Sequence, residues 1–394
     1  MKKLLLFLLT LPLSAVGQDK IDFKQGTILQ KQFCDTIPFE YVKNKMIVQV
    51  KINGQNKRFI FDTGAVLIIS DEIQEEMKNT ILGKNFLTDA NKQQKQISVV
   101  NVKEFKLNNL TFQNIPSVVS DIKSTGFLTC FNYDGFIGSN ALRNCIVHID
   151  IDKKYIILTD NISKLNLQNA YQTNLALDKQ SNPFVELNLN NQIKFNALFD
   201  SGSDDFITVS NDITKKALKK NIASVLNQGF GIGTIGMHGF GDAENKSRIL
   251  FANVKFGNTE ITNFTSEVSE KSYNAIGMQL ADYGTITIDY INKQFYFIPK
   301  QQSQTYRNQK TLGFSFLPKE TNYSVGTVWT NTQVEKIGLK SGFQILKFDD
   351  LDISKRTPEL DCQLFLSRTL SNGKIKLTYK DDKGQIKVAE LYEE

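Results

Sequence analysis

Two short segments of the chain carry the same carboxylate motif at the end of an apolar run. Asp62 stands in Phe-Ile-Phe-Asp-Thr-Gly-Ala, and Asp200 stands in Ala-Leu-Phe-Asp-Ser-Gly-Ser. One such triplet is common by chance, but two copies that each close an apolar strand are not. Two carboxylates brought face to face can share one proton, and such a pair can activate a water molecule against a peptide bond.

The two motifs belong to a longer internal repeat. Each follows an alternating strand and a tight turn, and each precedes a Ser N-cap with acidic residues in the first helical turn. Farther along, Phe136-Ile137-Gly138 matches Ala275-Ile276-Gly277 at almost the same interval from its motif. Such self-similarity indicates a duplicated unit. We therefore expect two all-β lobes whose motif strands meet in the middle, with helices chiefly at 70–80 and 211–222.

These motifs resemble those of aspartic proteases. The Asp-Thr-Gly-Ala and Asp-Ser-Gly-Ser segments, each followed by an apolar-apolar-Gly segment, are typical of that class, and Ala65 makes the chain more similar to retropepsin-like bacterial proteins than to pepsin. Retropepsins dimerise to assemble the aspartate pair, whereas here both halves lie in one chain, so a monomer is expected. The resemblance covers residues 38–300 and implies a mainly β, bilobal pepsin/retropepsin-like acid-protease fold.

The resemblance also implies roles for individual residues. Asp62 and Asp200 would be the catalytic pair of an aspartic-type endopeptidase that acts on polypeptides and needs neither a cofactor nor a metal. Two hydroxyls would cross-bond at the lobe junction, and two glycines would let the backbone approach the carboxylates and donate to them. These supporting residues are Thr63, Gly64, Ser201 and Gly202. The alternative is a pair of strand turns without catalysis.

A glycine-rich stretch at residues 229–241 contains a formal G-x-G-x-x-G pattern. It fails as a dinucleotide fingerprint because no helical pattern follows it. In the repeat it takes the place of a flap, the hairpin that closes over the substrate, and the second lobe would supply the larger flap. The residues predicted for this flap are Gly231, Gly233 and Gly236.

The remaining polar candidates receive non-catalytic interpretations. His148 matches Thr287 on a predicted strand, which favours a structural role, and His238 lies in the glycine-rich loop. No Ser-His-Asp or Cys-His arrangement is visible. The acidic pair at 204–205 is interpreted as a solvated turn, with selection of basic substrate residues as the alternative.

The bulk composition allows two or three domains, since the chain has 394 residues and 41% of them are hydrophobic. The formal net charge of +6 is spread over many lysines. No basic stripe with interleaved aromatic residues is present, which argues against nucleic acid as a partner.

The N-terminus has the pattern of a signal peptide. A basic Lys2-Lys3 pair precedes an apolar run at 4–13 and a small-x-small site at 15–17. The run is too short to span a bilayer and no later run is long enough, so we expect no stable membrane anchor and export to the periplasm or beyond the cell. Residues 18–37 are predicted to give a strand and a connection, and a role as a pro-segment stays open.

Export makes disulfides possible among Cys34, Cys130, Cys145 and Cys362, whose spacing is unlike that of a zinc site. Three pairings are possible, and all four thiols can also be free. Cys130 lies in an insertion of the first lobe relative to the second. A bridge to Cys145 would pin this insertion to a nearby strand and is the predicted pairing, with two free thiols as the alternative.

Beyond residue 311 the pattern changes. Two strands, a short helix near 334–337, the segment Gly-Leu-Lys-Ser-Gly-Phe-Gln-Ile-Leu at 338–346, a helix near 358–370 and two closing strands follow one another. This order resembles the PDZ domains appended to bacterial proteases. Phe343 departs from the pattern, because the family usually has Asp there, and the usual Ala before the helix end is missing.

The PDZ resemblance implies that this part binds peptide C-termini by adding them as a strand. The receiving loop would be Leu312, Gly313 and Phe314, and Leu364 or Phe365 would line an apolar pocket. Docking there would raise the local substrate concentration through a short linker. A groove filled by the chain's own residues is the alternative.

The sequence thus predicts an exported aspartic endopeptidase with a PDZ-like module for docking a substrate or partner. The alternatives are a catalytically inactive peptide-binding protein and a PDZ-mediated scaffold. The intact Asp200 argues against the first, because an inactive copy is free to lose it. The predicted divisions are a signal peptide (1–17), an N-terminal strand and connection (18–37), lobe 1 (38–165), lobe 2 (166–300), a linker (301–310) and the PDZ-like domain (311–394).

Overall fold

The structure is a computed structural model that describes residues 21–88, 91–122, 126–232, 235–236, 239–308, 310–366 and 373–394. With 52% strand and 14% helix, it confirms the predicted mainly β class. None of the helices in these ranges is long and apolar enough to cross a membrane. We refer to residues 21–165 as the N-terminal segment, 166–300 as the middle segment and 311–394 as the C-terminal segment.

The N-terminal segment contains a β-sheet that closes on itself. The hairpin of β4 and β5 pairs through β10 and β6 with β9, and β8 returns to β4, while β7 extends β8 as a long hairpin. Residues 59 and 61 point into the core, because side chains alternate across a strand. The strands are β1 (Thr27–Ile28), β3 (Glu40–Val42), β4 (Lys45–Ile52), β5 (Gln55–Asp62), β6 (Ile68–Ser70), β7 (Thr80–Thr88), β8 (Gln94–Leu107), β9 (Leu110–Ser120) and β10 (Gly135–Gly138).

The middle segment repeats these pairings. β14 and β15 form the hairpin that leads to Asp200, β22 pairs with β15 in parallel as β10 does with β5, and β17 and β20 form a second long hairpin. The strands are β14 (Pro183–Leu189), β15 (Ile193–Phe199), β16 (Ile207–Thr208), β17 (Ala223–Gly231), β18 (Ile235–Gly236), β19 (Gly239–Phe240), β20 (Glu244–Phe256), β21 (Thr259–Val268) and β22 (Ala275–Ile276).

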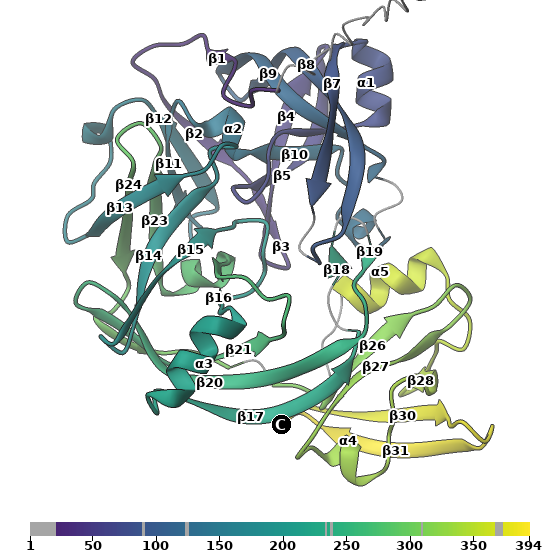
Figure 1. Ribbon diagram of the computed structural model, residues 1–394. Helices are drawn as coiled ribbons and strands as arrows, with labels where there is room; N and C mark the ends of the chain where they lie inside the picture. Colours follow the sequence, from purple (N-terminus) through teal and green to yellow (C-terminus); the bar gives the residue numbers. More distant parts are fainter. Residues whose placement is uncertain are drawn as a thin grey trace, which may run out of the picture.

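A sheet with strands from both segments joins them (Figure 1). At its centre β11 runs antiparallel to β23, and His148 lies opposite Thr287, its match in the repeat. The His148 Nδ1 and Thr287 Oγ1 atoms are 2.8 Å apart, and burial lowers the pKa of this histidine, in keeping with the predicted structural role. The strands are β2 (Cys34–Pro38), β11 (Ile146–Asp150), β12 (Tyr155–Thr159), β13 (Tyr171–Leu177), β23 (Gly284–Asp289) and β24 (Gln294–Pro299).

The predicted helices are present but end early. α1 (Asp71–Met77) begins after Ser70, whose Oγ accepts a hydrogen bond from the Ile73 N–H at 3.2 Å, and it ends because Lys78 adopts the left-handed conformation. α3 (Asn211–Lys219) begins after Ser210, which makes no capping bond through its side chain. The other helical elements are α2 (Ser139–Leu142), α4 (Gln333–Lys336), α5 (Pro358–Leu366), η2 (Gly126–Phe131), η3 (Ile162–Lys164) and η4 (Met278–Tyr283).

The predicted linker at 301–310 is packed against the middle segment. Its β25 (Ser303–Thr305) pairs in parallel with β21, and Tyr306 is buried with its ring stacked on Phe206 at 4.7 Å between centroids. The polar composition of this stretch suggested a free connection, but the strand edge of β21 and one aromatic side chain fix it. Residues 303–306 of the predicted linker are therefore held in place by a strand pairing and a buried aromatic ring.

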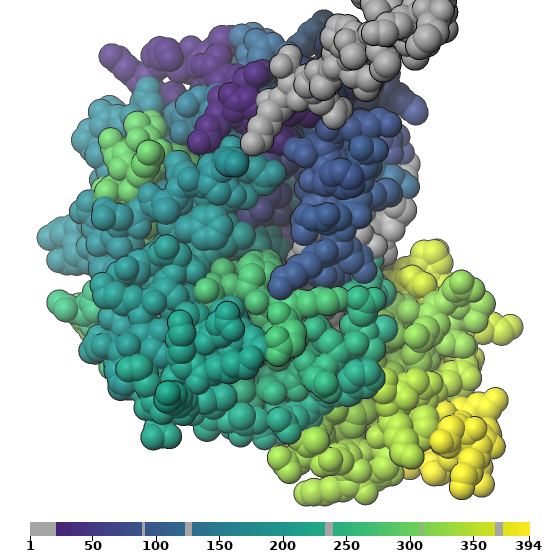
Figure 2. Space-filling model, viewed as in Figure 1, coloured from purple at the N-terminus to yellow at the C-terminus, as the bar shows by residue number. Residues whose placement is uncertain are grey.

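The C-terminal segment has its own hydrophobic core, and Leu312 and Phe314 lie in it. It continues the second long hairpin, because β27 pairs antiparallel with β17 at Gly229–Trp329 and Phe230–Val328. Figure 2 shows its atoms directly against those of the middle segment. The strands are β26 (Phe314–Pro318), β27 (Tyr323–Trp329), β28 (Gln344–Phe348), β29 (Leu351–Asp352), β30 (Lys374–Lys380) and β31 (Ile386–Tyr392).

The disulfide joins Cys130 to Cys362, with 5.1 Å between the Cα atoms, so the predicted bridge from Cys130 to Cys145 is wrong. Cys145 is free and fully buried, and its thiol donates to the Leu142 carbonyl, which directs it into the core. Cys34 is free and exposed. The bridge ties η2 to α5, where the Phe131 and Phe365 rings also meet edge to face at 5.5 Å. Phe365 therefore contacts the N-terminal segment, and Leu364 packs against the C-terminal core.

Candidate active site

The motif aspartates stand where two equivalent strands end. Asp62 is the last residue of β5 and lies beside Gly138 of β10. Asp200 follows β15 directly, and its N–H donates to the Ile276 carbonyl at 2.9 Å. A parallel neighbour thus fixes each strand end, and the shared sheet brings the two ends together. The predicted site residues Asp62 and Asp200 are adjacent in the structure.

Each carboxyl group packs on the glycine of the other motif. A Cβ atom added at Gly64 would lie 2.5 Å from Cγ of Asp200, and one added at Gly202 would lie 2.3 Å from Oδ2 of Asp62. No side chain fits at either glycine, so the close approach requires glycine. The carboxyl groups also accept N–H groups within their own motifs, from Gly64 to Asp62 Oδ1 and from Gly202 to Asp200 Oδ1, both at 2.9 Å.

The cross-bonding of the two hydroxyls is present. The Thr63 N–H donates to Ser201 Oγ at 2.9 Å, and the Ser201 N–H donates to Thr63 Oγ1 at 3.0 Å. Each hydroxyl then donates to the carbonyl before the opposite aspartate, Thr63 to Phe199 at 2.7 Å and Ser201 to Phe61 at 2.9 Å. Both side chains are fully buried. The four bonds lock the two motif turns in one geometry.

The environment favours the protonated form of both carboxyl groups. Burial raises the pKa of Asp62, and the neighbouring charge of Asp200 raises it further. Burial also raises the pKa of Asp200, while Lys45 and the hydrogen bond with Asp62 act in the opposite direction. Two carboxyl groups in such a pair titrate together and share one proton over a range of pH.

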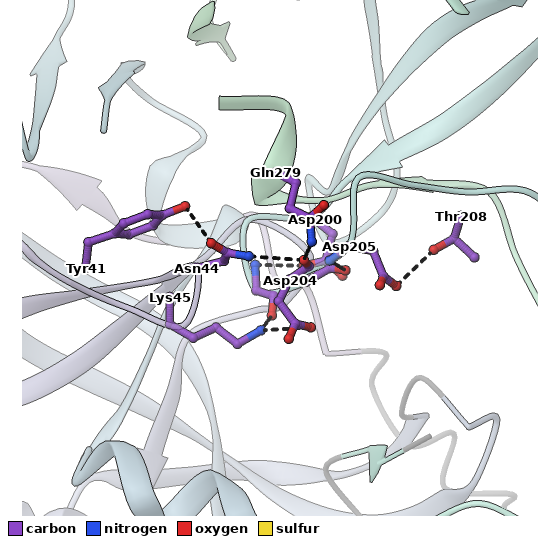
Figure 3. Close-up of polar contacts among 10 residues, drawn as sticks. Tyr41, Asn44, Lys45, Asp200, Asp204, Asp205, Thr208 and Gln279 are labelled. Carbon is purple, nitrogen blue, oxygen red and sulfur yellow. Dashed lines mark hydrogen bonds and ion pairs between the residues drawn. The ribbon is translucent and has the colours of Figure 1, made fainter. Parts of the chain in front are cut away.

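Lys45 is a site residue that the sequence analysis missed. It begins β4, is 8% exposed, and its ammonium donates to the Gly202 carbonyl across the junction. Figure 3 shows it reaching towards the loop after the second motif, where Nζ lies 3.8 Å from Asp204 Oδ1. The available signal is a lysine directly before the apolar run 46–48, at the position where the repeat has Asn182.

The acidic loop is more ordered than a free solvated turn. Asp204 and Asp205 are exposed, as predicted, but the Asp204 carbonyl accepts from Asn44 Nδ2 at 3.3 Å and from Gln279 Nε2 at 2.7 Å (Figure 3). Thr208 Oγ1 donates to Asp205 Oδ2 at 3.2 Å. The loop thus presents two carboxylates beside Asp200 in a fixed position.

Two long hairpins, β7–β8 and β17–β20, touch at their ends. Asn91 Nδ2 donates to the Gly239 carbonyl at 3.0 Å, and Gln93 Nε2 donates to the Phe240 carbonyl at 3.1 Å. The connection in the middle segment, residues 232–243, is longer than that in the N-terminal segment, residues 89–93, as the larger-flap prediction requires.

The three predicted flap glycines have different surroundings. Gly231 ends β17 with a φ of +152°, and a Cβ there would lie 2.6 Å from the Gly326 carbonyl of the C-terminal segment. Gly236 belongs to β18, paired with β19. Gly233 and His238 lie outside the described residues.

Among the predicted PDZ-like residues, Gly313 has a φ of +83°, and its N–H donates to Thr311 Oγ1 at 3.1 Å. Its carbonyl accepts from the Trp329 N–H at 2.9 Å. The side chains of Leu312 and Phe314 face the core and not a groove. Within the described part of the chain, no three His, Cys, Asp or Glu side chains gather so as to hold a metal ion.

A family model described as aspartyl protease matches residues 48–141. The match includes Asp62, the hairpin from within β4 onward and the segment through β10, and it supports an aspartyl protease domain of the retropepsin-like kind. No curated protein sequence matches the chain. The family match supports a protease hydrolase whose substrate is a polypeptide.

Proposed function

We propose that the chain is an exported aspartic endopeptidase with a bilobal catalytic unit and a PDZ-like C-terminal domain. The observation that carries the proposal is the reciprocal packing of Asp62 on Gly202 and of Asp200 on Gly64. A strand turn without catalysis has no need to place two acids together in a half-buried site, where their mutual repulsion costs stability. The Thr63–Ser201 bonds hold this costly arrangement in place.

The proposed reaction uses one charged and one protonated carboxyl group. The charged group takes a proton from a water molecule, whose oxygen attacks the carbonyl carbon of the peptide bond. The protonated group gives its proton to the carbonyl oxygen, which yields a neutral tetrahedral diol. One carboxyl group then gives a proton to the amide nitrogen, while the other, charged carboxylate takes a proton from a diol hydroxyl. The C–N bond breaks, an amine and a carboxylic acid leave, and the pair again holds one proton. No assignment of either role to Asp62 or Asp200 is required, because the pair titrates as a unit.

Export and the PDZ-like role are parts of the same proposal. The leader pattern at residues 1–17 supports export, although it lies outside the described residues. The order of elements from β26 to β31 and the left-handed Gly313 support a PDZ-like domain. The Cys130–Cys362 bridge agrees with an oxidising compartment.

The test is cleavage by the unaltered chain and by the Asp62→Asn and Asp200→Asn variants. Asn keeps the shape of the side chain but cannot share the proton, so each variant should lose several orders of magnitude in kcat, as groups that act as a unit do. Asp212→Asn, an exposed acid in the first turn of α3, is the matched control and should keep full activity. The assay uses a library of quenched fluorescent peptides from acidic to neutral pH. Activity of either dyad variant above a few per cent would exclude the assignment.

A further inference from the structure

A row of apolar side chains crosses the N-terminal sheet on the face that carries Asp62. Ile60 lies two residues before Asp62 in β5, so both side chains point to the same face. Residues directly opposite in neighbouring strands share a face, and the pairings continue the row from Ile60 strand by strand. Its members, all buried, are Ile60, Phe136, Ile68, Val118 and Val99. We call them the apolar row.

Phe23, which precedes the first strand, packs into the same hydrophobic cluster as the apolar row. It is 5% exposed, whereas its neighbours Asp22 and Lys24 are exposed. The preceding Ile21 reaches β7, where its Cδ1 atom lies 3.3 Å from the Cβ position of Gly83, the residue opposite Val99. The stretch 21–24 therefore lies along the far end of the row.

This stretch also lies between the two halves of the proposed catalytic unit. A groove of about 580 Å³ is lined by residues 21–24, by residues 82–85 of β7 and by residues 179–180 of the middle segment. The cluster that holds Phe23 includes Val66, which follows the first motif closely, and Ile97 from the hairpin strand β8. Phe23 thus belongs to one hydrophobic cluster with residues of the strand bearing Asp62, of the chain after it and of the hairpin.

We propose that Phe23 occupies an apolar subsite of the cleft, so that residues 21–24 are an internal ligand that a substrate with a large apolar side chain displaces. This inference rests on the proposed function and adds to it a substrate preference and a competing segment. One aromatic anchor between exposed charged neighbours is how a short extended peptide docks on a protein. In the described part of the chain no strand begins before Thr27, so displacing Phe23 breaks no sheet pairing.

The competition has a predictable size. Burial of one aromatic side chain changes an equilibrium by roughly 10-fold to 100-fold, and the apparent affinity of a competing ligand falls by the fraction of sites left open. Phe23→Ala should therefore strengthen binding of a peptide that fills the subsite by at least about 10-fold. Leu29→Ala, which truncates an exposed apolar residue of the same part of the chain, should leave binding unchanged.

The experiment measures binding without catalysis and cleavage separately. In an Asp200→Asn background, a fluorescein-labelled peptide Lys-Ile-Asp-Phe-Lys-Gln, copied from residues 20–25, is titrated into the parent, Phe23→Ala and Leu29→Ala proteins. The same peptide with Ala in place of Phe is the control ligand. With intact aspartates, kcat/KM is measured on peptides that carry Phe or Ala at each position.

Tighter binding of the Phe peptide to Phe23→Ala alone, with a matching rise in kcat/KM for Phe-containing peptides, supports the inference. Equal binding to all three folded proteins, no binding, or unchanged kcat/KM overturns it. If cleavage is absent from every protein, the proposed function fails, while the peptide titration still decides whether Phe23 fills a peptide site. If Phe23→Ala does not fold, hydrogen exchange in the parent decides. Amides 21–26 should exchange faster with saturating peptide, and unchanged protection contradicts displacement.

Discussion

Replacing Lys45 by Met tests the electrostatics of the aspartate pair with little change in side-chain volume. The Lys45 ammonium contacts the Gly202 carbonyl, and Gly202 in turn packs against the Asp62 carboxyl group. Burial raises the pKa of both aspartates, and the positive charge of Lys45 opposes this effect for both. Without the charge, the pKa values of the pair should rise, and the pair should keep its shared proton to higher pH.

The size of the shift follows from Coulomb's law. Opposite unit charges about 4 Å apart interact by about 4 kcal/mol at an effective dielectric constant near 20, and the interaction weakens as the separation grows. Both carboxyl groups are half-buried, so solvent reduces this interaction. We therefore expect a shift of about one pKa unit, which corresponds to about 1.4 kcal/mol.

The assay is the pH dependence of kcat/KM, whose two limbs report the pair. In Lys45→Met both limbs should move to higher pH by about one unit, with the shape retained. Lys194→Met is the matched control, because Lys194 lies on the strand that leads to Asp200 but forms an exposed ion pair with Glu186. Its profile should not move. An unchanged profile of a folded Lys45→Met protein, or a move to lower pH, would refute the reasoning.

Three further predictions follow from the site and the disulfide. The folded state raises the pKa of Asp62, so the contribution of this residue to stability is complete below about pH 4 and is lost as pH rises through the raised value. Asp62→Asn should therefore raise the melting temperature at pH 7.5 but not at pH 3. An equal change at both pH values would contradict this. Ser201→Ala leaves the Thr63 N–H and the Phe61 carbonyl without their hydrogen-bond partner. The free energy of unfolding, measured in urea, should fall by about 2–3 kcal/mol. A fall of less than about 0.5 kcal/mol would show that these bonds do not lock the two turns. Cys362→Ser opens a bridge between residues 232 apart and should cost roughly 3–5 kcal/mol. In the presence of reductant, the parent protein should have the same melting temperature as this variant. If reductant leaves the melting temperature of the parent protein unchanged, the bridge is not formed.

The features that could be predicted from the sequence are those encoded by short local motifs that occur twice in the chain. The strand ends at Asp62 and Asp200, the glycines after them and the cross-bonded hydroxyls all depend on residues within a few positions of each motif. The duplication also matched His148 with Thr287, and the structure places these two residues opposite each other in the shared sheet. Local structure encoded by a motif that is present in both halves can be predicted without knowing how the two halves pack together.

The features that escaped prediction all involve contacts between parts that share no pattern. Lys45 gains its role only because β4 faces the Asp204 loop of the other half. Cys130 pairs with Cys362 because α5 packs on η2. The local sequence around either cysteine does not predict this packing. The strand at 303–305 escaped prediction for the same reason, since the edge of β21 gives its polar residues a partner.

The attachment of the C-terminal segment changes how its proposed docking role can work. A gain in local substrate concentration requires a flexible connection, but Tyr306 is buried and β25 is paired. The segment also holds the strand β17 directly, because the Thr330 N–H donates to the Gln228 carbonyl at 2.7 Å and Asn227 Nδ2 donates to the Thr330 carbonyl at 2.8 Å. Movement of the second hairpin away from the aspartates must therefore break these bonds or carry the C-terminal segment with it. Since the bridge to Cys130 restrains that segment, the position of the hairpin and the packing of α5 on the N-terminal segment are mechanically linked.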